Sequence, residues 1–143
     1  MKNILVAVDI DTESRELVRM AAELAEKLRA RVWIVHVTAA EPDFVGYGVG
    51  PQYIRDIRAE DLRDEHRYLG EYCRNLRDRG IEAEALLIQG PTVKMILAEA
   101  QKLEIDLVVI GTHDHGFLYN AFSENTALEL VKKGRIPILT VPL

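Results

Sequence analysis

The stretch LVVIGTHDHGFLYNAFSENTALELVKKGRIPILTVP, residues 107–142, has the pattern strand, loop, helix, strand. It opens on an apolar run, continues through a charged helical segment over about residues 124–133, and closes on the apolar run IPILTVP, residues 136–142. Two apolar runs on either side of a helix are typical of a unit in which a right-handed crossover joins two parallel strands. This segment therefore predicts a parallel sheet.

The rest of the chain repeats the same alternation. Apolar runs predict strands near residues 3–9, 31–37, 83–89, 106–110 and 137–141, and the stretches between them predict helices over about 11–30, 53–79, 91–103 and 124–133. Continuous apolar runs of this length are typical of strands that are covered on both faces. The sequence therefore predicts one α/β domain over residues 1–143, with a five-stranded parallel sheet and helices on both faces.

Composition and charge narrow the class of protein. The 143 residues are 48% hydrophobic and 29% charged, which is typical of one globular domain, and the net charge of −5 lacks the basic surplus of a nucleic-acid-binding protein. No apolar run approaches the roughly 18 residues of a membrane span, and the N-terminus lacks a signal-peptide pattern. Cys73 is the only cysteine, so an internal disulfide is impossible. We expect a cytoplasmic protein without nucleic-acid or membrane partners.

Several polar or small residues follow the predicted strands. Asp9, Val37, Gly90 and Gly111 end or follow four of the apolar runs. In open parallel sheets, ligands bind beyond the carboxyl ends of the strands, near the switch in strand order. We therefore expect these positions to converge at one end of the sheet.

Motifs along the whole chain identify a family resemblance. They are ILVAVD at residues 4–9, IVHV at 34–37, QGP at 89–91, DLVVIGTH at 106–113 and IPILTVP at 136–142. With these motifs the chain resembles a universal stress protein domain from end to end. The resemblance implies an adenine nucleotide alpha hydrolase-like, Rossmann-like open sandwich, and a stress-response or signalling protein whose protein partner is unknown. It also implies a homodimer through the last strand, with Ile138, Leu139, Thr140 and Val141 at the interface.

The loop after the fourth strand departs from the family pattern. In nucleotide-binding members this loop reads Gly-x2-Gly-x9-Gly-Ser/Thr, and its glycines let main-chain amides approach the phosphates. Gly111 matches the first glycine, but Asp114 stands at the second, and Glu124 and Asn125 replace the final Gly-Ser. A like-charge pair at about 4 Å costs about 1 kcal/mol in water and up to ~4 kcal/mol at an effective dielectric near 20. We therefore expect a nucleotide site that is weakened or lost.

Two alternatives stay open for this site. The resemblance implies a nucleotide pocket of Ala7, Val8, Asp9, Val37, Ile110, Gly111, Asp114, Glu124, Asn125 and Thr126. A sensor of the same family would still bind ATP or AMP through the altered loop, with Mg²⁺ between phosphate and carboxylate. An ATP hydrolase is a further alternative, although no Ser-His-acid set, metal triad or intact phosphate loop supports an enzyme. A structural reading has Ser123 as the N-cap of the last helix and Glu124 in its first turn.

Other chemistry-bearing residues have structural interpretations. His113, Asp114 and His115 are types that bind Zn²⁺, but consecutive residues converge on one ion only through an unusual turn, so we expect a loop without a metal. His36 is interpreted as a hydrogen-bonded histidine within a strand, and Cys73 as a core residue. For Asp9 the resemblance implies contact with a nucleoside, and the structural alternatives are capping of a helix or solvation after the strand.

Overall fold

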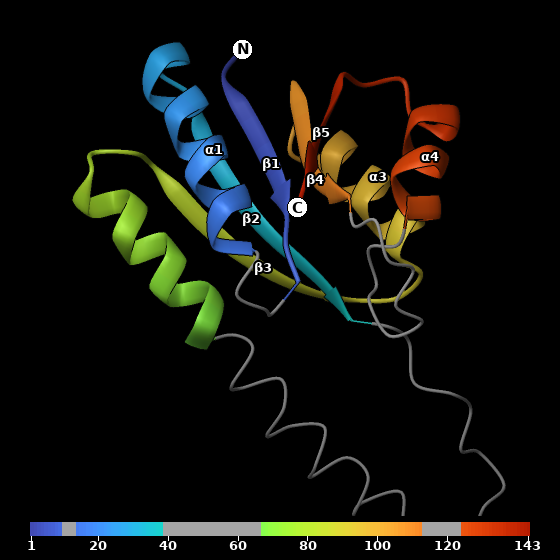
Figure 1. The fold of residues 1–143 in the computed structure, drawn as a ribbon, viewed down its shortest axis with the longest axis horizontal. Coiled ribbons are helices and arrows are strands. Elements are labelled where there is room, and N and C mark those ends of the chain that lie inside the picture. The colour runs from blue at the N-terminus through green and yellow to red at the C-terminus, as the bar shows by residue number, and fades with distance from the viewer. Residues whose placement is uncertain (10–13, 39–66, 113–123) are drawn as a thin grey trace, which may run out of the picture.

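The computed structural model describes residues 1–9, 14–38, 67–112 and 124–143 (Figure 1). Its strands are β1 (Asn3–Ala7), β2 (Arg31–Thr38), β3 (Ala83–Gln89), β4 (Leu107–Thr112) and β5 (Ile138–Pro142). Its helices are α1 (Ser14–Leu28), α3 (Thr92–Lys102), α4 (Glu124–Lys133) and one over residues 67–78, called here the 67–78 helix. The strands form one parallel sheet in the order β3-β2-β1-β4-β5. The predicted fold class is confirmed, and β5 lies at one edge of the sheet.

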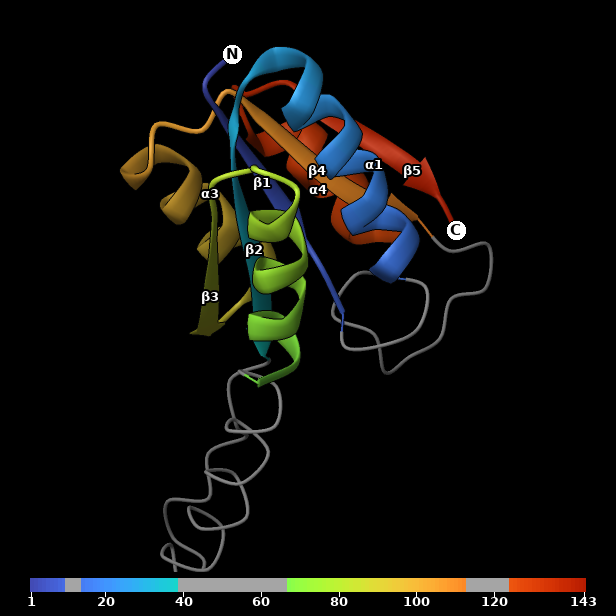
Figure 2. The ribbon, with the colours of Figure 1, turned by 90° about the vertical axis from the view of Figure 1, so that its left-hand side faces the viewer.

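The two faces of the sheet carry separate parts of the core. Along β1, Ile4 and Val6 pack with α1 and the 67–78 helix, whereas Leu5 and Ala7 pack with α3 and α4. Figures 1 and 2 show these two helical layers on opposite sides of the sheet. Side chains alternate between faces along a strand, so a strand covered on both sides needs apolar residues at every position. This is why β1 reads as a continuous apolar run.

Some predicted boundaries were wrong by a few residues. α1 ends at Leu28 rather than at Ala30, because Arg29 has a φ of 53° and this left-handed conformation ends a helix. β1 ends at Ala7 rather than at Asp9, although the next amide, that of Val8, still bonds to β2. β4 and β5 each extend to a later residue than predicted. Of the predicted helix over residues 53–79, the part before residue 67 lies outside the described residues.

The free edge of β3 is partly covered by a side chain. The Glu82 carbonyl accepts a hydrogen bond from Val32 of β2, so the carbonyl of the next residue, Ala83, points away from β2. Arg77 donates two hydrogen bonds to that Ala83 carbonyl, from Nε at 3.0 Å and from Nη2 at 2.6 Å. One acceptor of this edge is therefore already occupied within the chain.

The covering helices are amphipathic. On the outer side of α1, Arg19 pairs with both Glu16 and Glu23. On the inner side of the 67–78 helix, Cys73 is buried, which confirms it as a core residue, and this burial raises the pKa of its thiol. Among the described residues, no helix has the length and apolar character that crossing a bilayer requires.

Candidate functional site

The carboxyl ends of the three central strands lie side by side. Ala7 of β1 is in register with Val35 of β2 on one side and with Ile110 of β4 on the other. Val37 lies two residues beyond Val35, at the same end of the sheet. The chain leaves β1 toward β2 and later returns to the opposite side of β1 as β4. This is the switch in strand order at which open α/β sheets bind ligands.

The predicted pocket residues on these strands divide between the two faces. Ala7, Val37 and Ile110 are each at most 1% exposed and pack toward α3 and α4. Val8 is equally buried, but it packs on the opposite face, with α1. The strand ends therefore lie side by side as predicted, but their side chains are buried in the cores on the two opposite faces of the sheet.

Gly111 has a packing role that sequence reasoning missed. A side chain at this position would collide with the side chain of Leu143, and its Cβ would lie 3.7 Å from Cδ2 of Leu17. The Leu143 amide donates a hydrogen bond to the Thr112 carbonyl at 2.9 Å, which holds the C-terminal residue over β4. Gly111 thus allows the end of the chain to pack closely, for a reason unrelated to phosphate. No local signal marks a contact between residues so far apart in sequence.

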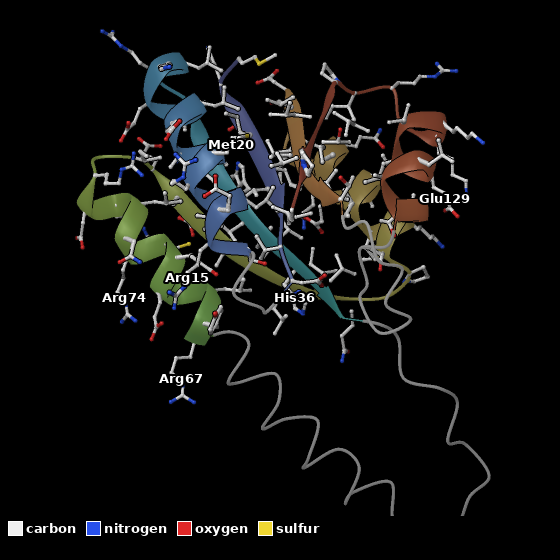
Figure 3. All side chains as sticks on the ribbon, viewed as in Figure 1. Arg15, Met20, His36, Arg67, Arg74 and Glu129 are labelled. Carbon is white, nitrogen blue, oxygen red and sulfur yellow. The ribbon has the colours of Figure 1, made fainter. Side chains whose placement is uncertain are left out.

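Two polar contacts hold the end of β1. His36 is 7% exposed, and its Nδ1 donates a hydrogen bond to the Val8 carbonyl at 2.7 Å. His36 is thereby confirmed as a hydrogen-bonded strand histidine, and Figure 3 shows it at the carboxyl end of the sheet. The hydroxyl of Ser14, the first residue of α1, donates to the main-chain carbonyl of Asp9. The polar link from Asp9 to α1 therefore uses Ser14, a residue that the sequence did not single out.

The remaining predicted site residues lie on or before α4. Helix α4 begins at Glu124, followed by Asn125, and Thr126 is buried in its first turn. Asp114 lies outside the described residues, as do His113 and His115. Within the described ranges, no three His, Cys, Asp or Glu side chains are grouped to hold a metal ion.

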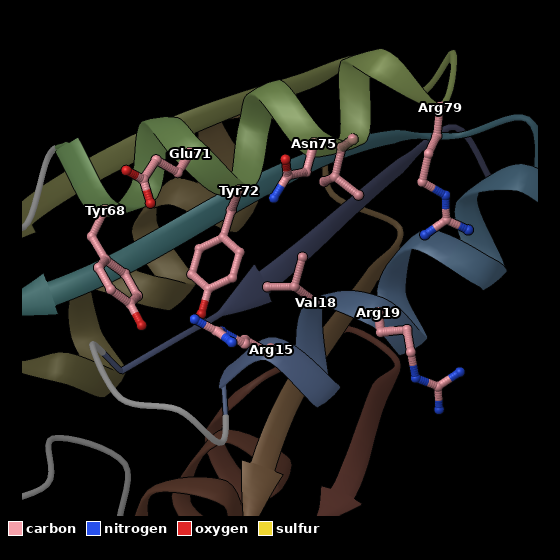
Figure 4. Close-up of a pocket in the computed structure, with 9 residues that line it drawn as sticks. Arg15, Val18, Arg19, Tyr68, Glu71, Tyr72, Asn75 and Arg79 are labelled. Atoms are coloured by element: carbon pink, nitrogen blue, oxygen red, sulfur yellow. The ribbon is translucent and has the colours of Figure 1, made fainter.

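A hollow of about 350 Å³ lies elsewhere, between α1 and the 67–78 helix (Figure 4). The rings of Tyr68 and Tyr72 meet edge to face on one side of it, with centroids 5.4 Å apart and planes at 79°. Arg79, at its far end, pairs with Glu26 at 2.8 Å. None of the residues that line this hollow is among the predicted site residues.

Fold and site together define a Rossmann-like α/β protein whose fourth strand carries Gly111 near its carboxyl end. A model of the Universal stress protein family matches residues 1–142, and the chain belongs to this family. It is 31% identical over 144 residues to Universal stress protein C of Salmonella typhimurium, covering 99% of this chain and 95% of that protein. It is 30% identical over 143 residues to Universal stress protein A of Yersinia pestis, covering 99% and 92%.

Solved structures share the fold at lower identity. Universal stress protein UspA from Lactobacillus plantarum superposes with a TM-score of 0.76 at 19% identity, covering 98% of this chain and 97% of that one. A universal stress protein from Archaeoglobus fulgidus in complex with dAMP has a TM-score of 0.67 at 21% identity, covering 98% and 97%. A universal stress protein in complex with cAMP has a TM-score of 0.65 at 18% identity, covering 99% and 96%.

Proposed function

We propose that this protein is a non-enzymatic stress-response protein, a homodimer whose nucleotide site is weakened or lost. Membership of the universal stress protein family supports the general role. The observation that carries the proposal is the composition of the segment that follows β4 and includes the first turn of α4. Asp114, Glu124 and Asn125 occupy the positions at which nucleotide-binding members of the family have small residues, and α4 begins at Glu124 itself.

The proposed site is the carboxyl end of the central strands. We assign to it the ten residues Ala7, Val8, Asp9, Val37, Ile110, Gly111, Asp114, Glu124, Asn125 and Thr126. The N-terminus of α4 favours anions through its free amides and the helix dipole. Acidic residues in the same loop oppose a phosphate, and any side chain keeps it farther from the main chain than glycine does. The repulsion grows with the number of phosphates, so ATP is disfavoured more than AMP.

A second candidate is a sensor of adenine nucleotides that carry a single phosphate. Two relatives of known structure are complexes with dAMP and cAMP, and each of these ligands has one phosphate group. Such a ligand brings less negative charge to the acidic loop than ATP does. Binding of ATP would need a cation such as Mg²⁺ to bridge the ATP phosphates and the carboxylates of Asp114 and Glu124.

The homodimer is assigned to the free edge of β5. Ile138 and Leu139 are only half-buried in the single chain, as expected of side chains that a partner would cover. Pro137 and Pro142 have no amide hydrogen, which limits a ladder with a second β5 to about Ile138–Val141. An antiparallel pair of identical strands is an isologous contact, in which each residue meets its symmetry partner.

Native mass spectrometry of the purified protein, followed by titration with ATP and AMP, tests these proposals. We expect twice the 16.2 kDa chain mass without bound nucleotide, and weak binding of ATP in the absence of Mg²⁺. Tight binding of ATP without Mg²⁺ would overturn the weakened site. Tight binding of AMP with weak binding of ATP would support the sensor of single-phosphate nucleotides. Sustained release of phosphate from ATP would support an ATP hydrolase.

A further inference from the structure

Helix α4 exposes two large apolar side chains on one flank. Four large apolar side chains in the described part of the chain are strongly exposed: Met1, Leu28, Leu128 and Val131. Only Leu128 and Val131 share an element, with exposures of 51% and 56%. Residues three apart on a helix are neighbours on its surface, so this pair forms a continuous apolar flank.

This flank points away from α3. Ala127 and Leu130 are buried against the sheet. Lys133 borders a hollow that Leu97 and Gln101 of α3 also line, so the side of α4 that carries Lys133 faces α3. Successive residues turn by about 100° around a helix. Leu128 and Val131 therefore lie on the flank opposite Lys133, above the edge of the sheet that β5 forms.

We propose that this flank packs against the same flank of α4 in a second copy of the chain. The inference rests on the proposed β5 dimer and adds a second layer to its interface. Two antiparallel β5 strands in one continuous sheet are related by a two-fold axis perpendicular to the sheet. Such an axis keeps both α4 helices on the same face, and each then lies beside the other across the shared edge.

Strand spacing supports this contact. α4 packs against both β4 and β5, and neighbouring strands are about 4.8 Å apart. A helix centred between β4 and β5 lies about 5 Å from a two-fold axis just outside β5, so the two α4 axes are about 10 Å apart. Packed helices are separated by 8–10 Å. Leu128 and Val131 are the side chains that fill this space.

Helix length and polarity agree with the same arrangement. The 10 residues of α4 span about 15 Å and the 5 residues of β5 about 17 Å, so the helix and the strand have similar lengths. The two-fold axis makes the two α4 helices antiparallel, so the positive N-terminal end of each dipole lies on the side of the other's negative C-terminal end. Ile136 and Ile138 already pack with the core below α4, so the apolar layer continues from the core into the contact.

Sedimentation equilibrium of substituted proteins separates this contact from the β5 ladder. We expect Leu128→Asp with Val131→Asp to raise the dimer dissociation constant by about tenfold or more, because two apolar side chains lose their partner. Leu139→Asp tests the ladder itself, and Leu28→Asp is a matched control at an exposed leucine far from β5. If only Leu139→Asp weakens the dimer, the β5 dimer stands and the α4 contact is overturned. A monomeric wild type, or a dimer insensitive to Leu139→Asp, overturns both.

Cross-linking gives a second readout of the same contact. In a Cys73→Ala background, Leu128→Cys places one thiol on each copy beside the two-fold axis. A short bismaleimide should join the two copies through this position and should not do so through Leu28→Cys. Equal yields for the two variants would overturn the proposed contact.

Discussion

His36 and Val8 are joined by a buried hydrogen bond, 2.7 Å from the imidazole Nδ1 to the main-chain oxygen, which ties the end of β2 to the end of β1. Val8 is fully buried, so water does not readily replace a lost donor. We expect His36→Leu to lower the free energy of unfolding by about 1–3 kcal/mol, measured by urea denaturation. His36→Gln keeps a side-chain donor and should lose less. Equal losses for the two variants would argue against the hydrogen bond as the cause.

Close packing at Gly111 predicts a coupling with the C-terminal residue. Gly111→Ala should cost about 1–3 kcal/mol of stability, because its methyl group meets the side chain of Leu143. Leu143→Ala removes the colliding atoms, so the double variant should be more stable than the sum of the two single losses indicates. Denaturation of the four proteins measures this difference. Simple additivity would show that the two positions are independent.

The contacts at Gly111 and His36 also show what the sequence predicts and what it does not. Continuous apolar runs predicted all five strands, because a strand covered on both faces is apolar at every position. The packing of Leu143 on Gly111 brings together two residues that are far apart in the sequence. A local sequence pattern does not predict such a contact. For the candidate site, the predicted fold already implied that the strand ends converge. The hydrogen bond from the Ser14 hydroxyl to the Asp9 carbonyl was visible only in the structure.

The Asp106 carboxylate, next to the start of β4, makes pH-dependent hydrogen bonds to the first residues of the chain. Its Oδ2 accepts hydrogen bonds from the main-chain amides of Lys2 at 2.7 Å and Asn3 at 3.0 Å, which hold the pKa of the carboxyl below its ordinary 3.8. A carboxyl whose pKa is lower in the folded than in the unfolded protein stabilises the fold at pH values above its unfolded pKa. This stabilisation is lost as the pH falls through the folded pKa.

We therefore expect Asp106→Asn to be less stable than the wild type at neutral pH, with the difference shrinking below about pH 4. Thermal unfolding across this range measures it. Glu99→Gln, on α3, is the control for removing a surface carboxylate. A difference that stays constant down to the acid end would mean that the Asp106 carboxylate is not the source.

Replacing the acidic loop residues should restore affinity for ATP. The variant Asp114→Gly, Glu124→Gly and Asn125→Ser recreates the small residues of the family pattern and removes two carboxylates. We expect its affinity for ATP without Mg²⁺ to rise about tenfold or more, since each repulsion is worth about 1 kcal/mol even in water. Isothermal titration calorimetry measures the change. Glu129→Gln is the matched control on the exposed side of α4, and an equal gain there would point to net charge alone.

The hydrogen bonds of Arg77 at the β3 edge bear on how far the sheet can extend from one copy of the chain to the next. A dimer joined through β5 would have one sheet of ten strands, the five of each copy, with β3 as the outermost strand at both ends. The two-fold axis of such a dimer would use both β5 edges at once, so further growth of the sheet would have to occur at β3. There the guanidinium of Arg77 already occupies the Ala83 carbonyl that an incoming strand would need. In such a dimer Arg77 would oppose the addition of a further strand at the Ala83 carbonyl, and so would oppose growth of the sheet beyond β3.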